Sequence, residues 1–380
     1  KTDRALWAYN NAALLAPTNS EVQYQLALLY AESRNFAKAL AHLKNIPKAS
    51  WRAEEFYLAT TSYLALDQKN EVRDLVWTLN ATAILDDAQI AALSSVLIKH
   101  DLADEAISLL KGSTQRFPES LSLHLQLGDA YSRKKLWQVA EEQYLAAIRI
   151  DANSILTLRG LAKTAQASGD PEKALAYLVQ AKKIAPDDSA VLYDFAVAAF
   201  RMNLIIDVLP VAEGLYKKNP DEPAYIHLLA VSKFRSDQKE DAEKLLRRYL
   251  QVRPRDSLGH YLLGITLYSV KRFSEARREF EQSQSIGPNP DSEYMLGVIA
   301  EAEGDRDTAV RWLQRIKPDC GCYPAAQTLL GVVYAQQNNS AAARTTLERA
   351  TQLNPRDLRA HYQLGLLLSK TGEKEKAQAM

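Results

Sequence analysis

Residues 120–153 read SLSLHLQLGDAYSRKKLWQVAEEQYLAAIRIDAN, and this stretch decides the fold. Three apolar residues recur at a spacing of four, which places them on one face of a helix; they are Leu123, Leu127 and Tyr131. Gly128 lies beside Leu127, and because a glycine inside a helix costs about 1 kcal/mol against alanine, it indicates the close approach of another helix. After a short break, a second apolar face follows with Ala140, Tyr144 and Ala147. The stretch predicts a helical hairpin that needs copies of itself on either side to bury both faces.

Such copies run along the chain at steps of 34 residues, with one step of 33. The place of Leu127 is apolar each time: Leu93, Leu161, Phe195, Leu229, Leu263, Leu296, Leu330 and Leu364. The next residue is always small: Ser94, Gly128, Ala162, Ala196, Ala230, Gly264, Gly297, Gly331 and Gly365. The place of Ala140 holds alanine except at Val208: Ala106, Ala174, Ala242, Ala276, Ala309, Ala343 and Ala377. Prolines that stop the second helix recur at Pro118, Pro186, Pro220, Pro254, Pro288 and Pro355.

This pattern resembles the tetratricopeptide repeat, which has the same period and small residues and aromatics at these offsets. The resemblance covers essentially the whole chain. It implies an all-α fold, a right-handed α-solenoid superhelix built from antiparallel helix pairs. It implies almost nothing about a specific activity, since one fold serves many functions.

The register of the repeats predicts the domain organisation. Residues 1–19 read as the second helix of a truncated repeat, and residues 20–86 as two degenerate repeats. Residues 87–357 form eight regular repeats, and residues 358–380 begin a final repeat that is cut off. Because neither end has a polar capping helix, we expect flanking domains or further repeats in the full-length chain.

The composition of the chain limits the kinds of partner that it can bind. The 47 Lys and Arg residues nearly balance the 46 Asp and Glu residues, whereas a nucleic-acid binder usually has a basic surplus. No stretch approaches the roughly 18 apolar residues that suggest a membrane span. The chain starts at Lys1 and shows no signal peptide. The sequence leaves both a cytoplasmic and a bacterial periplasmic location open.

Catalytic chemistry is not indicated. The chain lacks the HExxH, GxxxxGK[ST], GxGxxG and GxSxG motifs, and we predict neither an enzyme nor a cofactor. His124, His260 and His361 share one repeat position, which favours a packing role in the core or at its edge. Pro210 is expected in the first turn of a second helix that Asp207 caps.

Cys320 and Cys322 are the two cysteines of the chain, in the loop KPDCGCYP of residues 317–324. A thiolate metal site usually needs four ligands, and no histidine pattern accompanies the pair. A disulfide between them would close a small strained ring. We predict no metal site and no set task for the pair, with a redox or metal role as the alternative.

The resemblance implies a binding groove, because the first helices line the concave face in this family. The residues of this face are apolar or aromatic between about residues 190 and 300. The predicted groove residues are Tyr193, Val197, Phe200, Val231, Phe234, Tyr261, Ile265, Tyr268 and Tyr294. Their alternative role is to form aromatic contacts between neighbouring first helices.

Arg159 and Lys163 lie one turn apart on the same face and could meet an acidic group of a ligand. A solvated basic pair, or a salt bridge to Asp129, is the alternative. The asparagines of the family's carboxylate-clamp members, and the asparagine ladder of its sugar-transferase relatives, are missing.

Three functions remain open at this stage. The preferred one is a noncatalytic scaffold that binds a protein or peptide along the groove. The second is the regulatory or substrate-docking array of a larger enzyme or of a bacterial envelope assembly complex. The third is a purely architectural role through self-association.

Overall fold

The computed structural model describes residues 2–82, 84–373, 375 and 377. Within these residues all regular structure is helical, with twenty-two α-helices, one 3-10 helix and no strand. The predicted all-α class is therefore confirmed. The chain divides into two compact units, Lys1–Met202 and Asn203–Met380, and each is described by itself. The end of the predicted final repeat, residues 378–380, lies outside the described residues.

The first unit holds twelve of these α-helices and the 3-10 helix η1 (Lys48–Ser50). They are α1 (Thr2–Leu15), α2 (Ser20–Glu32), α3 (Phe36–Leu43), α4 (Ala53–Ala65), α5 (Lys69–Thr82), α6 (Asp87–Lys99), α7 (Ala103–Arg116), α8 (Leu121–Arg133), α9 (Trp137–Ile150), α10 (Ile155–Ala167), α11 (Pro171–Ile184) and α12 (Ser189–Arg201).

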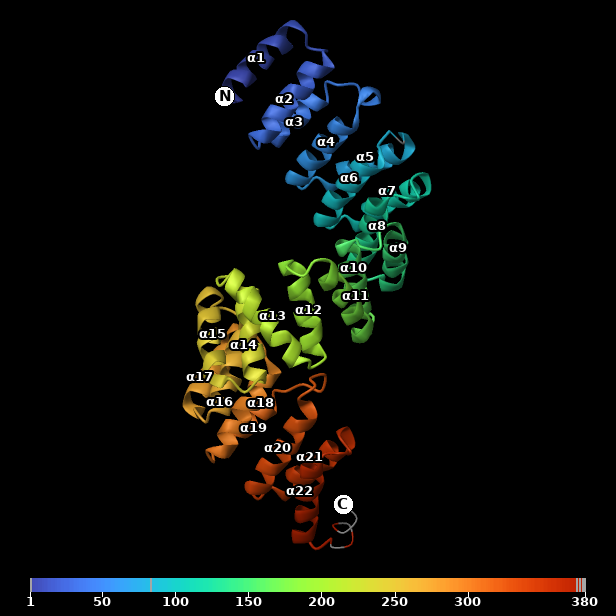
Figure 1. Cartoon of the computed structure of the whole chain (residues 1–380). Coiled ribbons are helices and arrows are strands. Elements are labelled where there is room, and N and C mark those ends of the chain that lie inside the picture. Colours follow the sequence, from blue (N-terminus) through green and yellow to red (C-terminus); the bar gives the residue numbers. More distant parts are fainter. Residues whose placement is uncertain (1, 83, 374, 376, 378–380) are drawn as a thin grey trace. The chain divides into compact units, whose positions relative to one another are not determined.

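The second unit continues the same alternation. Its described helices are α13 (Ile205–Lys218), α14 (Pro223–Arg235), α15 (Lys239–Val252), α16 (Ser257–Ser269), α17 (Phe273–Ile286), α18 (Pro290–Ala302), α19 (Arg306–Leu313), α20 (Tyr323–Gln336), α21 (Ser340–Leu353) and α22 (Leu358–Lys370). Within each unit, consecutive helices pair into antiparallel hairpins that stack on the next hairpin (Figure 1). This is the arrangement of an α-solenoid, and the handedness of its superhelix stays a prediction.

Short polar residues fix where many helices begin. The side chains of Asp188, Asp256 and Asp357 each accept hydrogen bonds from two backbone N–H groups of the helix that follows. These bonds satisfy donors that the first turn of a helix leaves unpaired. The caps therefore hold the register that the 34-residue spacing predicts.

The turn inside each hairpin contains a residue with positive φ, the left-handed backbone region. Glycine supplies it at Gly169, Gly304 and Gly372, and eight other residues adopt it despite their side chains. These are Arg34, Asp67, Asp101, Lys135, Asn203, Asp237, Lys271 and Asn338. Apart from Asn203, at the boundary of the two units, and Gly372, near the end of the described residues, each of these residues lies between the two helices of one hairpin.

The three histidines at the shared repeat position are structural, as predicted. The Nε2 atoms of His124, His260 and His361 lie 3.1–3.2 Å from the carbonyl oxygens of Pro118, Pro254 and Pro355, each six residues earlier. A ring that donates to this carbonyl ties the loop between hairpins to the helix that follows.

The helix that contains Pro210 begins earlier than predicted. Leu204 is its N-cap, so Asp207 lies in its first turn and Pro210 lies inside it. Proline removes the hydrogen bond to the carbonyl of residue 206. Because Ile206 is 90% exposed, water can reach the backbone there, which limits the cost.

Candidate functional site

A pocket of about 410 Å³ opens on the inner face of the first unit, where α8, α10 and α12 lie next to one another. Its lining includes four of the predicted residues: Arg159, Lys163, Tyr193 and Val197. Each of the three helices contributes an apolar side chain to its walls: Leu125 from α8, Leu156 from α10 and Val197 from α12. We call it the α8–α10–α12 pocket.

The floor of this pocket is polar because a buried tyrosine reaches it from below. Tyr144, on α9, is 1% exposed, and its hydroxyl donates a hydrogen bond of 2.6 Å to Oδ1 of Asp129. Burial raises the pKa of the Asp129 carboxyl, although the Tyr144 hydroxyl and the charge of Lys163 act to lower it. Burial also raises the pKa of Tyr144, and the Asp129 charge adds to this effect.

Two glycines give the Tyr144 ring its space. A Cβ atom added at Gly128 or at Gly160 would lie 2.6 Å from Cε1 of this ring. Gly128 belongs to α8 and Gly160 to α10, so the ring lies between two consecutive first helices. This explains the helical glycine that the sequence places beside Leu127.

Arg159 and Lys163 differ in their electrostatic state. The Nε atom of Arg159 lies 2.6 Å from Oδ2 of Asp194 on α12, so Arg159 is neither solvated alone nor paired with Asp129, the two alternatives that the sequence left open. Lys163 is exposed and makes no ion pair within the part of the chain that the structure describes. Of the two cations that line this pocket, Lys163 is therefore the more exposed and the one without an ion pair among the described residues.

The other predicted groove residues lie on α12, α14, α16 and α18, and all are half-buried. Phe200 follows Val197 along α12 in the first unit. In the second unit, Tyr261 packs on Phe280 with ring centroids 5.9 Å apart, and Tyr268 packs on Phe273 at 5.2 Å. These contacts run within a hairpin, from first to second helix, and the two tyrosine rings stay half-buried whereas Phe280 is fully buried.

The remaining residues of this stripe follow the same pattern. Ile265 packs at the edge of the core cluster that contains Phe280, and Tyr294 at the edge of the next cluster along the unit. Burial raises the pKa of both Tyr261 and Tyr294. Val231 and Phe234 are half-buried on α14.

A second pocket of about 340 Å³ lies near the start of the chain and was not predicted as a site. It is lined mainly by apolar and aromatic side chains of α2, α4 and α6, among them Tyr24, Leu28, Tyr57, Leu58 and Leu93. Its signal in the sequence is the pair Tyr24 and Tyr57, which hold the same repeat position as Tyr193 and Tyr261. Loose repeats obscured it, because residues 50–86 match the pattern poorly.

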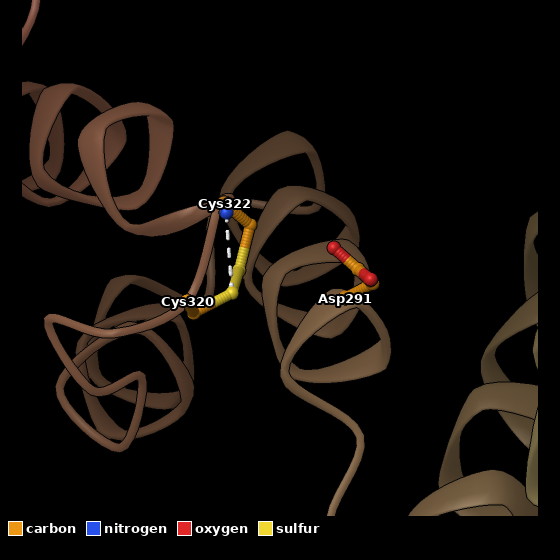
Figure 2. Close-up of side chains that lie close together, drawn as sticks. All are labelled: Asp291, Cys320 and Cys322. Carbon is orange, nitrogen blue, oxygen red and sulfur yellow. Dashed lines mark hydrogen bonds between the residues drawn. A yellow bond between two sulfur atoms is a disulfide. The ribbon is translucent and has the colours of Figure 1, made fainter. Parts of the chain in front are cut away.

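Cys320 and Cys322 form a disulfide in the loop between α19 and α20 (Figure 2). The backbone N–H of Cys322 donates to Sγ of Cys320 at 3.1 Å, and Asp291 of α18 lies beside the sulfur atoms. Sequence reasoning missed Asp291, which is 29 residues from the nearer cysteine. In the described part of the chain, none of the helices has the length and apolar character needed to span a membrane.

All the protein-family matches of this chain are to tetratricopeptide repeats. Models described as "Tetratricopeptide repeat" match residues 92–155, 160–188, 227–293 and 291–315, and one described as "TPR repeat" matches residues 323–372. No curated protein sequence matches the chain significantly.

Several solved structures are similar in fold. A tetratricopeptide repeat protein from Parabacteroides merdae is 16% identical with a TM-score of 0.52, over 65% of this chain and 98% of that one. PilW, a type IV pilus biogenesis factor, is 19% identical with a TM-score of 0.49, over 54% of this chain and 97% of its own. PilF of Pseudomonas aeruginosa is 18% identical with a TM-score of 0.47, over 55% of this chain and 97% of its own. At these identities the similarity concerns the fold alone.

Proposed function

Because the chain belongs to the tetratricopeptide repeat family, we propose that it is a noncatalytic scaffold that binds a segment of another protein along the inner faces of its first helices. The observation that carries this proposal is the α8–α10–α12 pocket. It is concave, it has apolar walls and a polar floor, and its volume lies in the range of ligand-binding pockets.

The chemistry of the pocket favours a segment with an apolar side chain next to an acidic one. The apolar side chain would pack against Tyr193, Val197 and Leu156, where its burial supplies most of the affinity. The acidic group would meet Lys163, since Arg159 is already neutralised by Asp194. The rim charge would set orientation more than affinity.

The half-buried stripe of the second unit supports the same function. Tyrosine suits a surface that is partly wet, because its flat ring packs while its hydroxyl stays hydrated. We propose Phe234, Tyr261, Ile265, Tyr268 and Tyr294 as further contacts for a ligand, together with Val231 on the same face.

A matched pair of double variants tests the pocket. Lys163→Glu/Val197→Asp alters its inner surface, whereas Arg149→Glu/Leu145→Asp makes the same kinds of change at exposed positions of α9. Each chain is immobilised and exposed to lysate of the source cells, and retained proteins are quantified by mass spectrometry. We expect a protein that the natural chain and the α9 variant retain equally and that the pocket variant loses by about tenfold or more.

Equal retention by the natural chain and the pocket variant would refute the pocket as the binding site. The variant Phe234→Ala/Tyr268→Ala tests the second unit in the same assay. A partner that it loses while circular dichroism stays unchanged would support the stripe, and full retention would remove these two residues from the proposal.

A further inference from the structure

The loop that carries the two cysteines owes its position to a short helix. α19 has 8 residues, whereas the second helices α15, α17 and α21 have 14. The chain therefore leaves the hairpin early, and residues 317–322 return across it before α20 begins at Tyr323. Tyr323 is buried, and both cysteines pack beside it at the edge of the core. The loop is thereby fixed against the body of the second unit.

Asp291 faces this loop from the first turn of α18 (Figure 2). One of its carboxylate oxygens and the Sγ atoms of Cys320 and Cys322 all lie within 4.8 Å of one another. Asp291 is exposed and the cysteines are half-buried, so the cluster is open to solvent on one side. Two consecutive hairpins thus bring three potential ligand atoms to one point.

In the disulfide state the sulfur atoms are neutral and hold no metal. If the bond were reduced, two thiols would stand next to a carboxylate. Thiolate and carboxylate are ligands of Zn²⁺, at about 2.3 Å for sulfur and about 2.0–2.2 Å for oxygen. Two ligand atoms on one tetrahedral ion stand about 3.5 Å apart, so a small movement would bring these three atoms into range.

The surroundings also suit a metal-bound thiolate. Cys322 occupies the N-cap position of α20, where the helix end favours negative charge. The N–H of Cys322 that points at Sγ of Cys320 would stabilise a charged sulfur in the same way. The open side leaves room for water as the fourth ligand.

We propose that the Cys320–Cys322 disulfide is reversible and that its dithiol form binds one Zn²⁺ ion together with Asp291. In the first step a small dithiol transfers two electrons and two protons to the disulfide and becomes a disulfide itself. In the second step Zn²⁺ binds both sulfur atoms and the Asp291 carboxylate, and the two thiol protons go to the solvent. The ion would link α18 to the start of α20 in the reduced state only. This proposal does not depend on the proposed peptide binding.

The test uses the full chain in two redox states. One sample is reduced with a phosphine, freed of the reductant without oxygen, and titrated with Zn²⁺ against a chromophoric chelator; the other is titrated in its oxidised state. We expect one Zn²⁺ per reduced chain and no tight binding to the oxidised chain. Co²⁺ as a second probe should give a sulfur-to-cobalt absorption band in the reduced sample.

Three variants separate the ligands from their surroundings. Cys320→Ser/Cys322→Ser should abolish binding and the cobalt band. Asp291→Asn should weaken Zn²⁺ binding by about tenfold or more, as the loss of a group that shapes a metal site does. Asp319→Asn removes an exposed carboxylate from the same loop and should bind as the natural chain does.

Each contrary result overturns part of the proposal. Zn²⁺ binding to the reduced chain that is no tighter than to the double serine variant would refute the metal site. Equal weakening by Asp291→Asn and Asp319→Asn would remove Asp291 as a ligand. Two free thiols in chain kept in air would refute the reversible disulfide. Circular dichroism of each variant confirms that any loss is not due to unfolding.

Discussion

The hairpins α8–α9 and α16–α17 carry different aromatic residues at the same position of their second helices, Tyr144 in the first and Phe280 in the second. In the first unit the Tyr144 hydroxyl donates a hydrogen bond to Asp129, and in the second unit Phe280 and Ile265 hold the same two repeat positions. Both rings are buried against the glycine of their own first helix, Gly128 or Gly264. In these two hairpins, the tyrosine occurs with a polar residue on the inner face, and the phenylalanine occurs with an apolar one.

The largest effect should come from closing the space around Tyr144. In the second unit Met295 holds the place of Gly160. Gly160→Met would give the first unit the same residue, but its Cβ would stand 2.6 Å from a fully buried ring. We expect a loss of about 3 kcal/mol in the free energy of unfolding, measured by urea denaturation with hydrogen exchange of α8–α10.

Gly112→Met is the control for this substitution. Gly112 is exposed on α7, and a Cβ atom added there would have nothing within 4 Å. Because glycine disfavours a helix by about 1 kcal/mol, this variant should be neutral or slightly more stable. If both variants lose the same stability, the ring is not what limits residue 160.

The next effect concerns the hydroxyl itself. Tyr144→Phe would leave the half-buried Asp129 carboxyl without its donor, which should cost about 1–2 kcal/mol in the free energy of unfolding. The double variant Tyr144→Phe/Asp129→Ile reproduces the pair of the second unit and should recover at least about 1 kcal/mol of this loss. Strictly additive single and double variants, measured by urea denaturation, would show that the two side chains are not coupled.

A pH dependence should distinguish the two hairpins as well. Burial raises the pKa of Asp129 in the folded chain, so the unfolded chain loses this proton first as the pH rises. The contribution of Asp129 to stability is therefore full below its ordinary value of 3.8 and is lost as the pH rises through the folded pKa. The unfolding free energy of the natural chain minus that of Asp129→Asn should fall across this range. A difference that rises with pH would contradict the assignment.

The smallest effect is expected at Ser132, which lies 3.4 Å from the Tyr144 hydroxyl and has Tyr268 in its place in the second unit. This separation makes a weak hydrogen bond. Ser132→Ala should therefore change the free energy of unfolding by less than about 0.5 kcal/mol. A loss as large as that of Tyr144→Phe, in the same urea titration, would transfer the main role from Asp129 to Ser132.

The sequence predicts the faces of the helices well and the partners of their side chains poorly. Spacing places Arg159 on the inner face, but Asp129 and Asp194 line the same pocket from the two neighbouring first helices, and spacing alone does not predict that Asp194 is its partner. Asp291 lies close to Cys320 because α19 ends after two turns and the loop that follows reaches α18. A contact between residues so far apart in the sequence cannot be predicted from the spacing of the repeats. The pocket near Tyr24 and Tyr57 was missed for a related reason, since irregular repeats hide the register that would have placed both rings together.

The left-handed turns inside the hairpins bear on how this chain can change over time. Arg34, Lys135 and Lys271 hold a backbone conformation that costs a residue with such a side chain about 1 kcal/mol or more, and glycine would remove that cost at the price of some unfolded-chain entropy. These turns touch neither the pocket nor the cysteine loop. Substitution by glycine at these turns could therefore raise the thermal stability of the array one hairpin at a time. Such a reserve would let the inner face of the array accept destabilising substitutions while compensating changes accumulate elsewhere.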